Sequence, residues 1–186
     1  MSVQLQKRHF TVDDYYRMGE TGILTEDDRV ELLKGEIIQM TPIGSRRAAC
    51  VDRLNRLLSQ RFGKETIVRV QNPVRIGEDT EPQPDLMLLR IRPDFYAHAH
   101  PKPEDIFLLI EVADTSADFD REVKIPLYAQ AGIPEVWLVD LPGEYVEVHS
   151  KPSATGYDNV QRMDRGQSLC PEAFAEIRLN VADMLV

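Results

Sequence analysis

Motifs for zinc binding, for nucleotide phosphates and for serine hydrolysis are all missing from this sequence. Only two cysteines occur, Cys50 and Cys170; they form no metal-ligand spacing, and a reducing compartment would leave both as free thiols. His98 and His100 have no third ligand at zinc spacing. A glycine-rich phosphate loop and a Gly-x-Ser-x-Gly segment are also absent. Any catalytic chemistry must therefore come from other residues.

Long apolar stretches are lacking too, because no run approaches the roughly 20 residues of a membrane span. The N-terminus, MSVQLQKRHF, has no apolar segment of the kind found in signal peptides. Hydrophobic residues make up 42% of the chain and charged residues 28%, a composition typical of folded domains. We therefore expect one cytoplasmic domain, residues 1–186, without membrane contact.

Hydrophobic periodicity and turn residues divide the chain into helices and strands. The predicted helices lie at about 11–19, 45–62 and 118–131, the last interrupted by Pro126. The predicted strands lie at about 66–76, 84–91, 106–113, 135–140, 145–149 and 175–179, after a hairpin over 29–40 that turns at Lys34 and Gly35. This order predicts an α/β fold in which helices cover both faces of a mixed central sheet. The expected core is 45–141, with an extra N-terminal helix and hairpin at 10–40 and C-terminal strands within 144–186.

Positive charge is in short supply, with 22 lysines and arginines against 31 acids and a net charge of −9. Proteins that bind nucleic acid nonspecifically usually carry a basic face, so this balance argues against avid coating of DNA. A negative net charge is still compatible with a local basic patch beside a metal ion. Arg46, Arg47 and Arg53 on the helix at 45–62 are the candidates for phosphate contact, and a solvated face paired with acids is the alternative.

Glu111 is the most informative residue, because it lies inside the apolar run 107–113. Such a run predicts a strand buried on both faces. An ionised carboxylate there costs several kcal/mol unless a cation or hydrogen bonds compensate it. The nearby candidates are Asp85 and Lys124. Two acids and a lysine around a buried strand end predict a divalent-metal site for phosphodiester chemistry, with Mg²⁺ bound by the two carboxylates.

Each candidate also has a simpler interpretation. Asp85 on its own is typical of a turn. Lys124 is equally compatible with a structural salt bridge to Glu111 or with a solvated position on a helix. Glu36, which closes the predicted hairpin, is either a further acid near the metal or a solvated turn residue.

Five segments carry a closer likeness to a known family. They are Val30-Glu-Leu-Leu-Lys-Gly-Glu-Ile37, Thr41-Pro-Ile-Gly-Ser-Arg46, Gln83-Pro-Asp-Leu86, Ile110-Glu-Val112 and Lys124-Ile-Pro-Leu-Tyr-Ala-Gln-Ala-Gly-Ile-Pro-Glu-Val-Trp-Leu-Val-Asp140. In these segments the chain resembles the Uma-type restriction-endonuclease family of the PD-(D/E)XK nuclease superfamily. Together the likeness spans residues 10 to about 150, which is most of the chain. One departure is Arg47, where relatives often carry histidine.

The resemblance implies a restriction-endonuclease-like core in which Asp85 and Glu111 hold the metal. The Val112 carbonyl is implied as a further ligand. In the superfamily's simplest pattern the catalytic lysine lies two residues after the acid, where this chain has Ala113. The resemblance places that lysine instead on the following helix, at Lys124.

Residues and resemblance together predict a Mg²⁺- or Mn²⁺-dependent endonuclease that cuts DNA with a metal-activated water. The alternatives are a noncatalytic nuclease-like domain that binds protein or nucleic acid, and a metal-dependent enzyme acting on another phosphate substrate such as RNA. The strands near 134–150 and the N-terminal hairpin offer more nonpolar surface than one small core needs. We therefore expect a homodimer, whose two sites would address two DNA strands.

Overall fold

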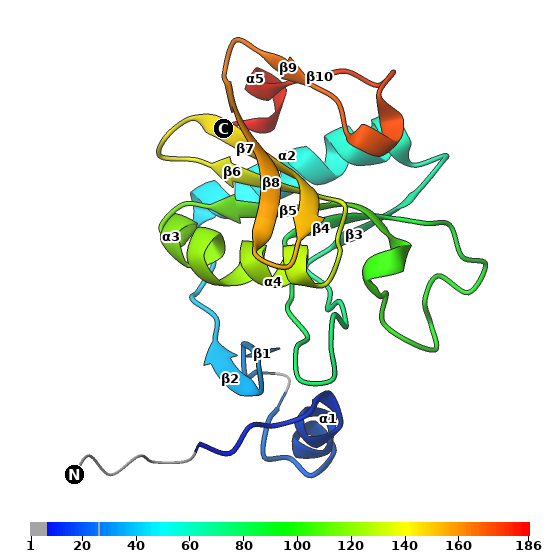
Figure 1. Cartoon of the computed structure of the whole chain (residues 1–186), viewed down its shortest axis with the longest axis vertical. Helices are drawn as coiled ribbons and strands as arrows, with labels where there is room; N and C mark the ends of the chain where they lie inside the picture. Colours follow the sequence, from blue (N-terminus) through cyan, green and yellow to red (C-terminus); the bar gives the residue numbers. More distant parts are fainter. Residues whose placement is uncertain (1–6, 26) are drawn as a thin grey trace.

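The computed structural model describes residues 7–25 and 27–186. Residues 1–6, the first part of the domain expected at 1–186, and residue 26 lie outside the described residues. At the centre is a six-stranded sheet in the order β3–β4–β5–β6–β7–β8 (Figure 1). Its strands are β3 (Ile67–Val70), β4 (Leu86–Leu89), β5 (Ile106–Ala113), β6 (Glu135–Asp140), β7 (Tyr145–Ser153) and β8 (Gly156–Asp164).

The remaining elements surround this sheet. The helices are α1 (Val12–Glu20), α2 (Ser45–Phe62), α3 (Ala117–Phe119), α4 (Ile125–Gln130) and α5 (Val181–Met184), with a π-helical turn at Asp120–Lys124 and 3₁₀ turns at Pro103–Asp105 and Glu172–Phe174. The short strands are β1 (Val30–Leu33), β2 (Glu36–Gln39), β9 (Ser168–Leu169) and β10 (Leu179–Asn180). In the described part of the chain, no helix combines the length and apolar character that a membrane crossing requires.

The central sheet is mixed, because β5 and β6 are parallel and its other neighbouring strands are antiparallel. A parallel pair needs a long crossover, and the helical segment 117–130 supplies it. Every residue of β4 and β6 is buried, which explains why the sequence of β4 and the centre of β6, residues 136–139, are apolar without alternation. The predicted α/β fold with a mixed sheet flanked by helices is confirmed.

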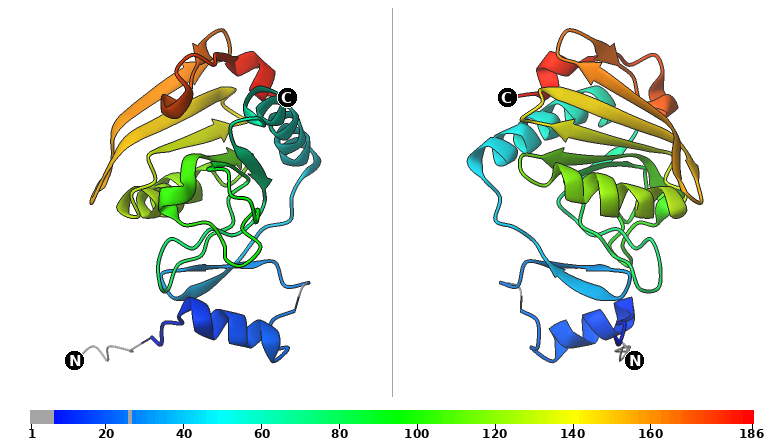
Figure 2. Two further views of the ribbon diagram at one scale, coloured as in Figure 1. Left: turned by 90° about the vertical axis from the view of Figure 1, so that its right-hand side faces the viewer. Right: turned by 60° about the vertical axis from the view of Figure 1, so that its left-hand side comes forward.

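Helices cover the two faces of this sheet, α2 on one face and α4 on the other (Figure 2). Successive side chains of β5 point alternately to the α2 face and to the α4 face of the sheet. Ile110 and Val112 pack into the core beside α2, whereas Leu109 and Ala113 pack beside α4. Glu111 lies between Ile110 and Val112, so its side chain belongs to the α4 face.

The N-terminal helix and hairpin lie at the end of the molecule opposite α5 (Figure 1). Thr11 caps α1 and forms a capping box with Asp14, as the sequence predicts. The hairpin β1–β2 turns at Lys34 and Gly35, whose φ angles of 50° and 74° fit a type I′ turn. A backbone hydrogen bond from Glu81 to Leu32 ties the hairpin to the loop before β4.

The structure departs from the sequence expectations at the two ends of the sheet. The strand expected at 66–76 ends at Val70, because Gln71 has a φ of 50° and Pro73 has no N–H to donate. The central sheet continues beyond the expected boundary at 141 and ends with β8. The tail strand expected at 175–179 is only the two-residue β10, paired with β9.

Candidate active site

Asp85 and Glu111 meet on the α4 face of the sheet. Leu86 of β4 pairs with Ile110 of β5 in an antiparallel register, so Asp85, one residue earlier, lies in line with Glu111, one residue later. Both residues are 1% exposed. The two acids therefore lie side by side on one face of the sheet, as a shared metal ion requires.

Donors surround the Asp85 carboxylate. Its Oδ2 accepts hydrogen bonds from the Val112 backbone N–H at 2.9 Å and from Arg47 Nη2 and Nε at 2.8 and 3.2 Å. Its Oδ1 accepts a hydrogen bond from Gln71 Nε2 at 3.2 Å. The turn interpretation is therefore insufficient for Asp85, because this side chain joins β3, β4, β5 and α2.

The Glu111 carboxylate is satisfied on one oxygen only. Its Oε1 accepts hydrogen bonds from Lys124 Nζ at 2.8 Å and from the Tyr128 hydroxyl at 2.6 Å. Its Oε2 is buried and has no hydrogen-bond partner within the described residues. Burial raises the pKa of Glu111 to about 8, against the opposing effect of Lys124, and the negative charge of Asp120 adds to the increase. A further cation at Oε2 would relieve this imbalance.

A π-helical turn brings Asp120 and Lys124 to the same cluster. The Ile125 N–H donates to the Asp120 carbonyl, five residues back, and Pro126 follows as the first turn of α4 begins. Asp120 and Lys124 are both buried. Burial raises the pKa of Asp120, although the nearby Lys124 ammonium acts in the opposite direction. The sequence predicted an interruption of the helix at Pro126, but it did not predict that the Asp120 side chain is buried.

Glu31, not Glu36, is the hairpin acid that reaches this cluster. Glu31 is buried; its Oε2 lies 3.3 Å from Lys124 Nζ and accepts a hydrogen bond from the Gln83 N–H. The Glu36 side chain is 44% exposed and is bound by Lys7 at 2.9 Å, which is the solvated alternative. The signal for Glu31 was present in the sequence, because it interrupts an apolar strand as Glu111 does.

The three candidate arginines of α2 have different partners. Arg47 turns inward to Asp85 and its side chain is only 16% exposed. Arg46 lies at the surface, bonded to the Leu141 carbonyl and 3.5 Å from Asp114. Arg53 binds the Leu185 carbonyl after α5. A continuous phosphate-binding face on α2 therefore does not form in this arrangement.

A cavity of about 280 Å³ opens onto the buried cluster. Its lining residues are Glu31, Ile38, Gln39, Met40, Thr41, Arg47, Thr115, Ser116, Phe119, Asp120 and Lys124. Charged groups thus face the cavity from the hairpin, from α2 and from the π turn. A ligand that enters here meets two cations and two acids.

The residues around Asp85 fit a divalent cation. Among the described residues, no group of three His, Cys, Asp or Glu side chains is arranged to hold a metal ion. Mg²⁺ commonly takes only one or two carboxylates and keeps several waters. Asp85 and Glu111 supply that pair, and the unpaired oxygen of Glu111 supplies a vacant acceptor. The donor set is therefore compatible with Mg²⁺ or Mn²⁺.

Comparison with known proteins identifies the family and the fold of this chain. A family model described as "Putative restriction endonuclease", Uma2, matches residues 12–182. The chain belongs to the Uma2 family. A crystal structure of a "putative nuclease belonging to DUF820" from Anabaena variabilis ATCC 29413 has a similar fold, with a TM-score of 0.70 at 17% sequence identity. The match covers 94% of this chain and 97% of that chain. No curated protein matches the sequence.

The Uma2 family and the nuclease-like fold confirm the resemblance seen in the sequence. They also place the hairpin and the segment from Lys124 to Asp140 within the family match. At 17% identity, the structural likeness shows the fold alone. The activity of the site rests on its own geometry.

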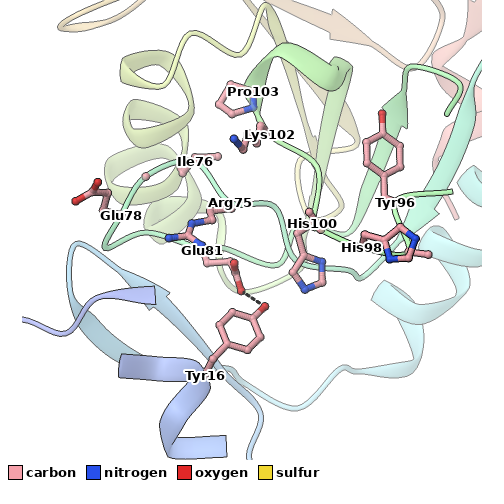
Figure 3. Close-up of a pocket in the computed structure, with 13 residues that line it drawn as sticks. Tyr16, Arg75, Ile76, Glu78, Glu81, Tyr96, His98, His100, Lys102 and Pro103 are labelled. Atoms are coloured by element: carbon pink, nitrogen blue, oxygen red, sulfur yellow. Dashed lines mark hydrogen bonds between the residues drawn. The ribbon is translucent and has the colours of Figure 1, made fainter. Parts of the chain in front are cut away.

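This Uma2-family chain also has a larger pocket, of about 760 Å³ (Figure 3). Tyr16 from α1 lines one side and donates a hydrogen bond to Glu81 Oε1 at 2.7 Å. Arg75, His98, His100 and Lys102 are among the other lining residues. None of the buried cluster residues lines this pocket, so its size does not make it the candidate catalytic site.

Proposed function

We propose that this chain is a Mg²⁺- or Mn²⁺-dependent endonuclease that hydrolyses DNA phosphodiester bonds. The observation that carries the proposal is the pairing of buried Asp85 and Glu111 on one sheet face, beside Lys124. The unpaired Glu111 Oε2 supports it, within the described residues. Membership of the Uma2 family agrees with a nuclease.

Asp85, Glu111 and the Val112 carbonyl would hold the ion. When bound, Mg²⁺ would lower the pKa of a water molecule and neutralise charge on the phosphate. Two acids, Glu111 and Glu31, raise the pKa of Lys124 in spite of its burial. Lys124 therefore stays an ammonium at neutral pH and serves as a fixed positive charge toward the phosphate. It does not serve as a proton acceptor.

DNA is the proposed substrate, and the contacts to it are proposed to be local. The net charge of −9 disfavours attraction over the whole surface. Arg46, half-exposed at the start of α2, is the best placed of the three arginines to meet a phosphate. Arg47 faces the cavity, and Arg53 lies farther along α2. A homodimer is part of the proposal, because cleavage of two strands needs two sites.

A noncatalytic domain that binds protein or nucleic acid is the second candidate. One observation favours it: both acids already have cationic partners, Arg47 for Asp85 and Lys124 for Glu111. Such pairs also occur in purely structural networks. Metal binding and cleavage separate the two candidates.

The test is cleavage of duplex DNA, single-stranded DNA and RNA in the presence of Mg²⁺ or Mn²⁺, with a chelator control. We expect Asp85→Asn and Glu111→Gln each to lower the rate by about a hundredfold or more. Glu36→Gln is the matched control, since it also removes one carboxylate but at an exposed site. Equal rates in the wild type and in Asp85→Asn would refute the proposed site. Cleavage of RNA alone would refute DNA as the substrate.

A further inference from the structure

The Oδ2 atom of Asp85 carries more donors than it can keep when a metal ion binds. Three N–H groups point to it, one from the Val112 backbone and two from Arg47. A carboxylate oxygen has about two lone-pair positions. A cation at this oxygen must therefore displace a donor.

Arg47 is the donor that can leave. The Val112 N–H belongs to β5, whose backbone is held by β4 and β6. The Arg47 guanidinium instead ends a long flexible side chain and borders the cavity of about 280 Å³. Asp120 lies on the same cavity wall and attracts the Arg47 charge, so an acidic partner is available away from Asp85.

We propose that Arg47 is a built-in competitor of the metal ion, which occupies Asp85 in the metal-free protein and must swing into the cavity before the ion binds. This inference rests on the proposed metal site and adds a residue that sets its affinity. The guanidinium neutralises a buried carboxylate until the ion replaces it. Displacing Arg47 costs free energy, which offsets part of the binding free energy of the ion. The affinity for the metal is therefore lower than it would be with the two acids and no arginine.

Mn²⁺ binding measured by isothermal titration calorimetry, without DNA, tests the competition. We expect Arg47→Met to lower the Kd for Mn²⁺ by roughly tenfold or more, because the competing cation is gone. Arg47→Lys, which keeps the charge but loses the two-pronged contact, should give an intermediate Kd. Arg56→Met removes the same charge from an exposed position of α2 and should leave the Kd unchanged. Thermal unfolding of each variant checks that it is folded.

The outcomes separate this proposal from the proposed function. A tighter Kd in Arg47→Met with an unchanged Kd in Arg56→Met supports the competition. If the wild type binds Mn²⁺ and Arg47→Met binds it with equal or lower affinity, the competition is overturned and the proposed metal site stands. No binding in the wild type or in Arg47→Met overturns both proposals. If Arg47→Met does not fold, the Arg47→Lys result decides between the first two outcomes.

Discussion

Lys124 is buried between two glutamates, and its removal would leave both without a cation. Glu111 and Glu31 each contact its Nζ, at 2.8 and 3.3 Å. Breaking a buried pair by deleting one partner usually costs more than the pair contributed, because an uncompensated charge remains. The lysine is therefore important for stability whether or not the protein is a nuclease.

We predict that Lys124→Met lowers the free energy of unfolding by about 3 kcal/mol at pH 7. Urea denaturation measures the change. Glu111→Gln in the same chain should restore part of the loss, because it replaces the buried carboxyl group that lost its ammonium partner. Lys102→Met, at an exposed position, is the control and should change stability by less than about 0.5 kcal/mol. If Lys124→Met and the Lys124→Met/Glu111→Gln double variant lose the same free energy of unfolding, the lost partner of Glu111 is not the cause.

Glu135 is a buried acid at the start of β6, separate from the candidate site. The Trp137 indole N–H and the Glu172 backbone N–H donate to its two oxygens. Burial nevertheless raises its pKa to about 7, and the two hydrogen bonds act in the opposite direction. The protonated form is therefore favoured by folding.

The sign of the pH effect follows from this increase. A pKa raised by folding gives stability that is complete below the unfolded pKa of 4.5 and is lost as the pH rises through about 7. We predict that the wild type loses up to roughly 3 kcal/mol between pH 4.5 and 7.5 relative to Glu135→Gln. Denaturation curves across this range measure the difference. If the free energies of unfolding of the wild type and Glu135→Gln change with pH in the same way, ionisation of Glu135 does not destabilise the fold.

At the scale of elements, the N-terminal hairpin matters because it delivers Glu31 to Lys124. Its tight turn sets the pairing of β1 with β2, and thereby the face on which Glu31 lies. Gly35 has a φ of 74°, and an added Cβ would lie 2.5 Å from the Cβ of His9. Both the backbone conformation and the space favour glycine there.

We predict that Gly35→Ala lowers the free energy of unfolding by about 1–3 kcal/mol. Gly166→Ala is the matched control, because Gly166 has no positive φ and open space around its Cβ position. Chemical denaturation of both variants decides. If the two substitutions cost the same, the turn is not under the predicted constraint.

The π turn is the element that assembles the rest of the cluster. It widens the helix by one residue before Pro126, and so both Asp120 and Lys124 reach the buried side. A regular helix through Pro126 would lack one hydrogen bond and would meet a steric clash. The crossover between β5 and β6 is thus the segment that brings Lys124 to Glu111.

At the scale of the whole molecule, metal binding and folding should be coupled. A ligand that binds only the folded protein stabilises it by about 2.7 kcal/mol at a hundredfold excess over its Kd. We predict a corresponding rise in Tm with Mg²⁺ or Mn²⁺ for the wild type, and none for Asp85→Asn. Calorimetric scans with and without metal measure both. Equal shifts in the two proteins would show that Asp85 is not a ligand.

The oligomeric state is the second question at this scale. Strand β6 is fully buried within the monomer and β7, which lies between β6 and β8 in the sheet, is partly buried, so part of the surface that suggested a homodimer serves the core. Val160 on the edge strand β8 is exposed and is the contact that we propose. We still predict a homodimer, as part of the nuclease proposal, at micromolar concentration. Light scattering that gives the mass of one 21.3 kDa chain would refute it.

Local sequence determined the elements of this protein and the two acids of the candidate site. Period and capping residues placed α1, the hairpin and α2, because these signals act over a few residues. A charge inside an apolar strand pointed to Glu111, and the family likeness to Asp85 and Lys124. Tertiary structure alone decided that Glu31, and not Glu36, contacts Lys124, and that the Asp120 side chain is buried. It also decided that Arg47 binds Asp85. Those contacts join segments far apart in the chain, and no local pattern records which distant partner a charged side chain will meet.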